Sequence, residues 1–267
     1  APPAIFSVVV CGIASLLGII KFKLVPNIVS ALLLSNFGKY WCEGTNYALW
    51  FVSALLFGFV ILFFVLKYTK ESDKLAVFIT ISAICYTILT ISHKGQYGGY
   101  RHMLYGFLAV STLRALGGMC VGCAVGQLYK KYANIVQEWI PSLFNKLFIN
   151  VLEMGSLGYI LWWSFCAHKK VNHIYYVYAF TILFVCFLCK KGWLSKLFDK
   201  DIWVNLGRYS YSIFVMHAPI LTILYQGVWK KNVAFVTAHN YVPIICDLLL
   251  ILIVGVLTYY FVEKPSF

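Results

Sequence analysis

Long apolar runs recur along the whole chain, and they constrain its fold more than any single motif does. Eight of them are plausible membrane-spanning helices: residues 4–20, 47–66, 75–92, 105–129, 149–167, 174–189, 203–225 and 242–262. A ninth run, 27–37, is only about eleven residues long and suits an interfacial or re-entrant segment. Because helices satisfy their own backbone hydrogen bonds in lipid, we predict an all-α transmembrane bundle of about eight spans plus this short segment.

The composition agrees with this prediction. Hydrophobic residues make up 61% of the 267 residues and charged residues only 12%, whereas soluble domains carry about 25% charged residues. We therefore expect a multi-pass integral membrane protein in contact with membrane lipid, with residues 1–267 forming one domain. The net charge of +13 comes from residues in short loops between apolar runs, so we expect no nucleic-acid partner.

The basic residues also predict an orientation. Ten lysines lie in the loops 67–74, 130–148 and 190–203, and the loops on the other side carry six lysines or arginines. Cytoplasmic loops are enriched in Lys and Arg, so the first set should be cytoplasmic. With eight spans, both ends of the chain, including the C-terminus, are then cytoplasmic. Counting 27–37 as a ninth span would place only the N-terminus outside.

Several soluble-enzyme chemistries find no support in the sequence. The closely spaced cysteines Cys120 and Cys123 lie within an apolar run and have no His or carboxylate at ligand spacing. We interpret them as small residues at a helix interface and predict no metal site. The nucleophile elbow Gly-x-Ser-x-Gly, the P-loop and the His-Glu-x-x-His motif do not occur.

Arg114 lies near the middle of the run 105–129, at a depth where charged side chains commonly mark functional sites. It either pairs with a carboxylate or backbone carbonyls, or serves as a cation for a phosphate, a carbonyl oxygen or a sugar carboxylate. The same run contains Gly118, Gly122 and Gly126. Small residues at this spacing predict a smooth face for close helix packing.

His217 lies about ten residues beyond Gly207, or roughly 15 Å along a helix. It is either a neutral core histidine bonded to Ser210, Tyr211 or a neighbouring helix, or a residue that lines a site. Ser210 and His217 should share one face of the helix. Pro219 leaves one backbone carbonyl without its helical partner, which can widen a cavity or kink the helix.

Other polar and aromatic residues lie at the ends of spans or in loops. Trp50 suits the aromatic belt at a span entrance, with Ser53 one turn further in. Arg101 belongs to an outer loop rich in rings and hydrogen-bond donors, which suits either sugar stacking or a membrane interface. Glu153 and Asp247 should be solvated or cap helices, and Glu263 and Lys264 should form an interfacial ion pair.

Four segments, in this order, together resemble the membrane acyltransferase-3 family. They are Trp50-Phe-Val-Ser-Ala-Leu-Leu, the glycine-rich helix around Gly118, Gly207-Arg-Tyr-Ser-Tyr-Ser-Ile-Phe-Val-Met-His217, and Tyr260-Phe-Val-Glu-Lys-Pro265. Phe214 stands where the family often has tyrosine.

The resemblance implies an enzyme of the bacterial cytoplasmic membrane, usually with ten spans. It would move an acyl group, with acetyl expected, from cytosolic acyl-CoA to a hydroxyl of an outer glycan or lipid-linked sugar. Lipopolysaccharide O-antigen, capsule and peptidoglycan are such acceptors. Acyl-CoA would be the co-substrate, without a metal.

The resemblance also suggests roles for individual residues. Arg114 and His217 become the candidate catalytic residues: Arg114 contacts the donor or the oxyanion, and His217 with Ser210 lines the acceptor or acyl path. Further candidate substrate contacts are Tyr211, Trp50, Ser53 and Arg101. The reaction implied is general-base activation of a hydroxyl, or transient acylation, with cations stabilising the oxyanion.

One departure from the family pattern concerns the start of the chain. In the family a histidine on the first span follows a basic residue by about ten positions, and an arginine cluster precedes prolines before the third span. Pro2 and Pro3 resemble the end of that cluster, so we expect the chain to begin at the third span and to be inactive alone. The competing hypotheses are a transporter of a small solute or lipid-linked sugar that uses His217 and Arg114, and an inert remnant. We see no internal symmetry of the kind that many transporters have.

Overall fold

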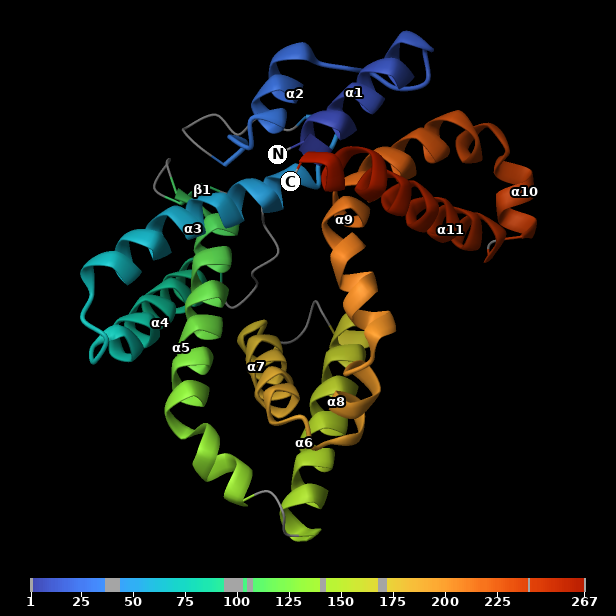
Figure 1. The fold of residues 1–267 in the computed structure, drawn as a ribbon. Coiled ribbons are helices and arrows are strands. Elements are labelled where there is room, and N and C mark those ends of the chain that lie inside the picture. The colour runs from blue at the N-terminus through green and yellow to red at the C-terminus, as the bar shows by residue number, and fades with distance from the viewer. Residues whose placement is uncertain are drawn as a thin grey trace. The chain divides into compact units, whose positions relative to one another are not determined.

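The computed structural model describes residues 2–36, 44–93, 103–104, 108–139, 143–167, 172–239 and 241–266. Within these residues the chain is helical (Figure 1), except for one short antiparallel pair of strands, β1 (Met103–Leu104) and β2 (Leu108–Ala109). The α-helices are α1 (Pro2–Leu16), α2 (Leu24–Ala31), α3 (Leu49–Tyr68), α4 (Lys74–His93), α5 (Val110–Trp139), α6 (Leu143–Trp162), α7 (Ile174–Cys189), α8 (Trp193–Phe198), α9 (Asp201–Gly227), α10 (Val233–Ala238) and α11 (Tyr241–Thr258). A π-helical turn follows α6 at Trp163–Ala167, and another follows α11 at Tyr259–Glu263.

The all-α prediction is confirmed, since each of the eight runs predicted to span the membrane overlaps a helix. By length and composition, α3, α4, α9 and α11 can cross a membrane, and α1 and α7 are shorter apolar helices. These helices indicate an integral membrane protein. The short segment predicted at 27–37 is the eight-residue helix α2. Pro26 lies in its first turn, where a missing backbone N–H costs nothing.

The predicted basic loop 130–148 is largely helical. Helix α5 continues to Trp139 and α6 already begins at Leu143, so Lys130, Lys131 and Lys146 lie on helices. The apolar pattern ends near residue 129, but residues after it still favour helix, and a helix can continue beyond its apolar part. The short helices α8 and α10 were not predicted, because six residues do not contain two full helical turns of any pattern.

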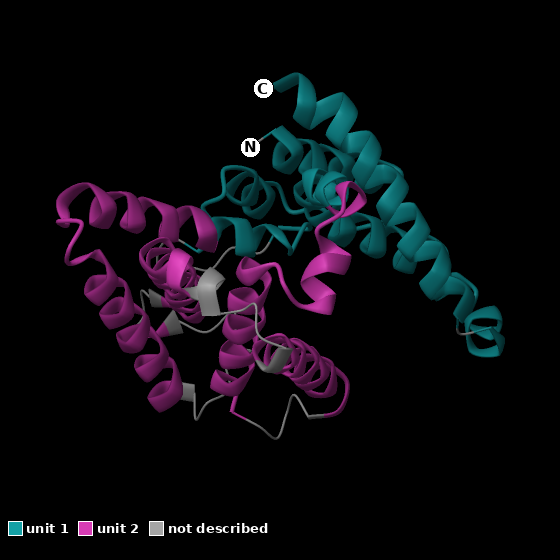
Figure 2. Cartoon of the chain, turned by 60° about the horizontal axis from the view of Figure 1, so that its bottom comes forward, with its two compact units in different colours: residues 1–53, 204–267 teal, residues 54–203 magenta. Residues whose placement is uncertain are grey.

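The chain divides into two compact units (Figure 2). Unit 1 comprises residues 1–53 and 204–267, and unit 2 comprises residues 54–203. In unit 2, α4 packs along α5 around Phe78, Tyr86, Leu89, Val110 and Leu113, all of them buried. A second cluster in the same unit joins α6 to α7 through Ile149, Cys186 and Cys189.

In unit 1 the buried side chains come from both ends of its sequence. Ala4 of α1, Leu49 at the start of α3 and Val215 of α9 form one cluster, and each is fully buried. A second cluster contains Cys11, Ala14 and Ile20 with Ile223 of α9 packed against it. The segment that carries His217 is thus held within unit 1 by contacts more than 160 residues apart in sequence.

Candidate functional site

Arg114 lines a cavity of about 480 Å³ in unit 2, between α5 and α7. The side chain is partly buried on the first turns of α5, and Tyr86 of α4 lines the same cavity. A guanidinium group has a fixed planar set of N–H donors that suits phosphate, carboxylate and developing oxyanions. The cavity gives such a ligand room beside the arginine.

Aromatic rings and a second imidazole complete this cavity. Trp163 follows α6, and its ring centroid lies 4.8 Å from that of His173 and 4.2 Å from that of Tyr176. All three residues line the cavity together with Arg114. His173 immediately precedes α7, so the start of this helix and the turn after α6 bring an imidazole and a guanidinium to one cavity. His173 was not among the residues predicted from the sequence to form a site.

The glycines of α5 do not all pack as predicted. A Cβ atom at Gly117 would lie 3.1 Å from the Tyr86 ring and 3.2 Å from the Cys85 Cβ, so this glycine lets α4 and α5 approach closely. At Gly122 and Gly126, in contrast, a Cβ would meet no atom within 4 Å among the described residues. Gly118 and Gly122 line the Arg114 cavity. Their lack of a side chain therefore leaves the cavity open next to the arginine.

In unit 1, Pro219 removes the N–H that would bond the carbonyl of Val215, four residues earlier in α9. Asn46 replaces it: its Nδ2 donates to the Val215 oxygen at 3.0 Å and also to Ser7 Oγ at 2.8 Å. Asn46 Oδ1 in turn accepts from the backbone N–H of Ala48. The carbonyl freed by the proline thus keeps a hydrogen-bond donor, and α9 stays continuous through Gly227.

His217 lies on this helix with its Nδ1 against the carbonyl oxygen of Phe214. A carbonyl only accepts, so Nδ1 carries the hydrogen in this contact, and Nε2 keeps its lone pair. Tyr47 packs edge-on against the imidazole, with ring centroids 6.2 Å apart, and the Phe214 ring lies at 5.3 Å. The ring is held by aromatic neighbours and presents one nitrogen that can take a proton.

The two C-terminal sequence motifs meet in unit 1. Ser212, which is fully buried on α9, donates its hydroxyl to the Glu263 carboxylate. The hydroxyls of Tyr209 and Tyr260 are 3.1 Å apart. A Cβ at Gly255 of α11 would lie only 2.8 Å from a backbone atom of α9, so this glycine is required for the close approach. Glu263 therefore accepts a hydrogen bond from Ser212 of α9, whereas the sequence had suggested an ion pair with Lys264.

The predicted substrate contacts fall in different surroundings. Ser210 is exposed and donates to the Gly207 carbonyl at 2.7 Å. Tyr211 packs with the cluster around Val215. Ser53 is fully buried and accepts from the Asn36 backbone N–H at 3.2 Å, and the Trp50 carbonyl accepts from the Asn36 side chain at 2.7 Å.

The predicted residues do not fall in a single unit. Arg114 belongs to unit 2, and His217 with its neighbours belongs to unit 1. Arg101 lies outside the described residues.

Glu153 caps a helix, one of the two roles expected for it. The residue is fully buried on α6, and its two oxygens accept the backbone N–H groups of Leu194 at 2.9 Å and Ser195 at 3.3 Å in the first turn of α8. Asn150, one turn earlier, accepts from Trp193 N–H at 2.8 Å. Asp247 accepts from the indole N–H of Trp229 at 2.8 Å. These two carboxylates have structural partners.

Charged residues gather where the loop before α4 meets α5. Lys74 donates to Oε2 of Glu71, Gln127 donates to Oε1 at 3.3 Å, and Lys130 Nζ lies 3.9 Å from the same Oε1. The hydrogen bond from Lys74 lowers the pKa of Glu71 below its ordinary value, and that from Gln127 adds to the effect. Among the described residues, no group of three or more His, Cys, Asp or Glu side chains gathers as a metal site would require.

Comparison with models of known protein families gives a match over nearly the whole chain. A family model described as an acyltransferase domain, of the acyltransferase 3 type, matches residues 1–262. No curated protein and no solved structure matches the chain. The matched region covers the Arg114 cavity of unit 2 as well as the His217 segment of unit 1.

Proposed function

The chain belongs to the acyltransferase 3 family, and on that premise we propose that it moves an acyl group from cytosolic acyl-CoA to a hydroxyl of a cell-surface glycan or lipid-linked sugar. Family membership implies a membrane O-acyltransferase that uses an acyl donor and an acceptor. We further propose that the protein lies in the cytoplasmic membrane with its C-terminus in the cytoplasm, and the identities given for donor and acceptor are part of the same proposal.

The observation that carries the proposal is the cavity that Arg114 and His173 share. In ester formation, the acceptor hydroxyl attacks the thioester carbonyl, and the carbonyl oxygen becomes an oxyanion. A guanidinium beside that oxygen stabilises it. An imidazole in the same cavity takes the hydroxyl proton and returns a proton to the leaving CoA thiolate, so that protons balance over the cycle. The products are the O-acyl ester and free CoA.

His217 has a separate place in this proposal. Its Nδ1 is occupied by the Phe214 carbonyl, so Nε2 can accept a hydrogen bond from a hydroxyl group. We assign it, with Ser210 on the same helix, to the path of the acceptor or the acyl group. Variants of the two histidines should therefore behave differently, because His173 transfers the proton and His217 positions a substrate.

The test uses the full-length protein expressed from its own gene in native membranes. Acyl transfer is measured as alkali-labile radioactivity from labelled acetyl-CoA, at equal protein levels. We expect Arg114→Gln and His173→Gln each to lower the rate at least 100-fold. The matched controls are Arg208→Gln and His239→Gln, whose side chains are exposed, and both should retain the wild-type rate.

His217→Gln should raise KM for the acceptor more than it lowers kcat. Unchanged transfer in Arg114→Gln would remove this residue from the site. Solute counterflow without any ester product would identify a transporter and refute the proposal.

A further inference from the structure

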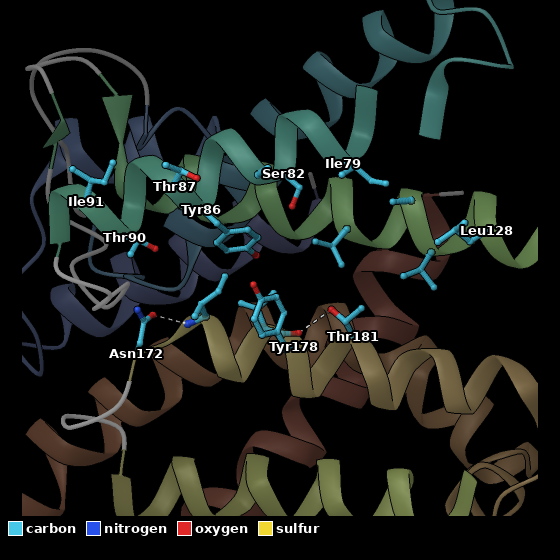
Figure 3. A pocket seen from close by; sticks show the side chains of 16 residues that line it. Ile79, Ser82, Tyr86, Thr87, Thr90, Ile91, Leu128, Asn172, Tyr178 and Thr181 are labelled. Carbon is cyan, nitrogen blue, oxygen red and sulfur yellow. Dashed lines mark hydrogen bonds between the residues drawn. The ribbon is translucent and has the colours of Figure 1, made fainter. Parts of the chain in front are cut away.

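A groove of about 660 Å³ runs between α4, α5 and α7 in unit 2 (Figure 3). On α4 its lining extends from Ile79 to Ile91, which is about 18 Å at 1.5 Å per residue. That length is more than half of the roughly 30 Å hydrocarbon layer of a bilayer. The groove is therefore long in the direction of the helices and has the volume of a ligand site.

The groove and the Arg114 cavity adjoin each other. Tyr86, Val121, Val177 and Thr181 line both of them. In Figure 3, Tyr86 of α4 faces Tyr178 and Thr181 of α7 across this space. A ligand in the groove can thus extend to the guanidinium group without leaving unit 2.

The lining of the groove is suited to a hydrocarbon chain. Apolar residues such as Ile79, Val121 and Leu128 supply most of it. The Thr181 hydroxyl donates to the carbonyl of Val177 in its own helix at 2.8 Å, so it does not need a ligand partner. A polar arm with amide groups, such as the pantetheine of CoA, would exchange water for a mainly apolar surface here, which is costly.

Several residues that line the groove are exposed. Ile79, Tyr178 and Ile91 are 51%, 57% and 76% exposed although they line it. Ile79 and Ile91 lie on α4, which is long and apolar enough to cross a membrane, and such exposure there faces lipid. A chain dissolved in the bilayer could therefore enter sideways, while its polar end reaches Arg114.

We propose that the α4–α5–α7 groove binds the single hydrocarbon chain of a lipid-linked acceptor, and that Arg114 in the adjoining cavity binds the phosphate joining this chain to its sugar. The inference rests on the proposed function, and it selects the lipid-linked sugar from the acceptors considered there. Arginine pairs with phosphate through two parallel hydrogen bonds, and its three remaining N–H groups stay available for the oxyanion of the proposed reaction. The rings of Trp163 and Tyr176 offer the sugar an aromatic surface in the same cavity.

The test is photolabelling of the full-length protein in detergent with a C20 prenyl phosphate that carries a diazirine on its chain. Labelled peptides are identified by mass spectrometry and should come from α4, α5 and α7. Unlabelled prenyl phosphate should compete at least tenfold better than the C20 prenyl alcohol or phosphatidylglycerol. A C5 prenyl phosphate should compete at least 100-fold less well than the C20 compound, because each buried methylene contributes about fourfold, or ~0.8 kcal/mol.

Two variants fill the groove from different helices, so the test does not depend on the folding of either one. Ala124→Phe on α5 and Ser82→Phe on α4 each place a ring where a 7% exposed residue lines the groove. Both should lower labelling at least tenfold. Ile84→Phe is the control, because Ile84 is 53% exposed on α4 and does not line the groove. Arg114→Gln should keep labelling of the groove and lose the preference for phosphate over alcohol.

Three outcomes would overturn the inference. Equal competition by phosphatidylglycerol would identify an ordinary membrane-lipid site. Stronger competition by myristoyl-CoA would assign the groove to the acyl chain of the donor. Labelling of both phenylalanine variants at the level of Ile84→Phe would place the probe elsewhere. Failure of the proposed function looks different: the groove would still label selectively, but no ester would form from any acyl-CoA.

Discussion

Replacing Gly192 by alanine should destabilise unit 2 through a single buried carboxylate. Gly192 immediately precedes α8, and its φ of −77° is one that alanine adopts without strain. A Cβ atom added there would overlap the carboxylate of Glu153. That carboxylate is fully buried and accepts the N–H groups of Leu194 and Ser195, so it cannot move aside without breaking those bonds.

The size of the effect follows from the bonds that are lost. A hydrogen bond to a charged group contributes about 1.5–3 kcal/mol. Displacing the carboxylate weakens two of them, and part of the loss is recovered by relaxation, which gives about 3 kcal/mol. For a domain of 150–250 residues this corresponds to a fall in Tm of about 6–12 °C. In a Glu153→Ala background the overlapping atoms are gone, and Gly192→Ala should cost about 1 kcal/mol or less.

The assay is thermal unfolding of the detergent-solubilised protein, followed by the loss of its monomeric peak in size-exclusion chromatography. The four proteins of the double-mutant cycle are compared under identical conditions, and a coupling of at least about 2 kcal/mol is expected. Equal destabilisation by Gly192→Ala in both backgrounds would show that Glu153 is not the group it disturbs. The assignment of Glu153 as the cap of α8 would then be wrong.

Three further predictions concern particular contacts. Gly122→Leu should abolish acyl transfer, measured as ester formation in membranes, because Gly122 lines the Arg114 cavity. Gly126→Leu, one turn along α5 and equally open, should leave acyl transfer unchanged. Loss of transfer in both variants would point to misfolding of α5 instead. Asn46→Ala should lower the free energy of unfolding by about 1–3 kcal/mol in the wild-type background, and by much less in a Pro219→Ala background, where the backbone N–H is restored. Equal losses in thermal melts of the two backgrounds would show that Asn46 does not replace the hydrogen bond that Pro219 removes. Because the pKa of Glu71 is lowered in the folded protein, its carboxylate stabilises the fold above the unfolded pKa of about 4.3, and this stabilisation disappears as the pH falls through the folded pKa. Melting curves of wild type and Glu71→Gln should therefore differ at neutral pH and converge in acid. A difference that persists in acid would assign the effect to something other than the carboxylate charge.

The helices were predictable because their apolar runs are long. Hydropathy located a helix at each of the eight predicted runs, the charge within an apolar run singled out Arg114, and the family motifs singled out the His217 segment. The loss of a hydrogen bond to the Val215 carbonyl also follows from Pro219 and helical spacing alone. The partner that replaces it could not be predicted, since Asn46 is 169 residues away in sequence.

Other features depend on which face of a helix is covered. Ser210 was chosen because it shares a face with His217, but Ser212 is the buried serine that bonds to Glu263. Helical periodicity assigns Ser210 and Ser212 to different faces of α9, but it does not predict which face packs against α11. The glycines of α5 pose the same difficulty. Their spacing predicts that another helix can pack closely against α5, yet the space beside Gly122 is part of the Arg114 cavity. His173 was missed because the other residues that line its cavity come from α4, α5, the turn after α6 and α7 itself.

The most direct measurement compares wild type with Arg114→Gln, using acyl-CoA labelled with ¹³C in the acyl group and native membranes that contain the full-length protein. Mass spectrometry of the glycan and lipid-linked sugar fractions then shows whether a labelled O-ester forms. We predict the ester in wild-type membranes, and at least 100-fold less of it in Arg114→Gln membranes with the same amount of protein. Equal labelling in both, or no labelled ester in wild-type membranes, would contradict acyl transfer at the Arg114 cavity.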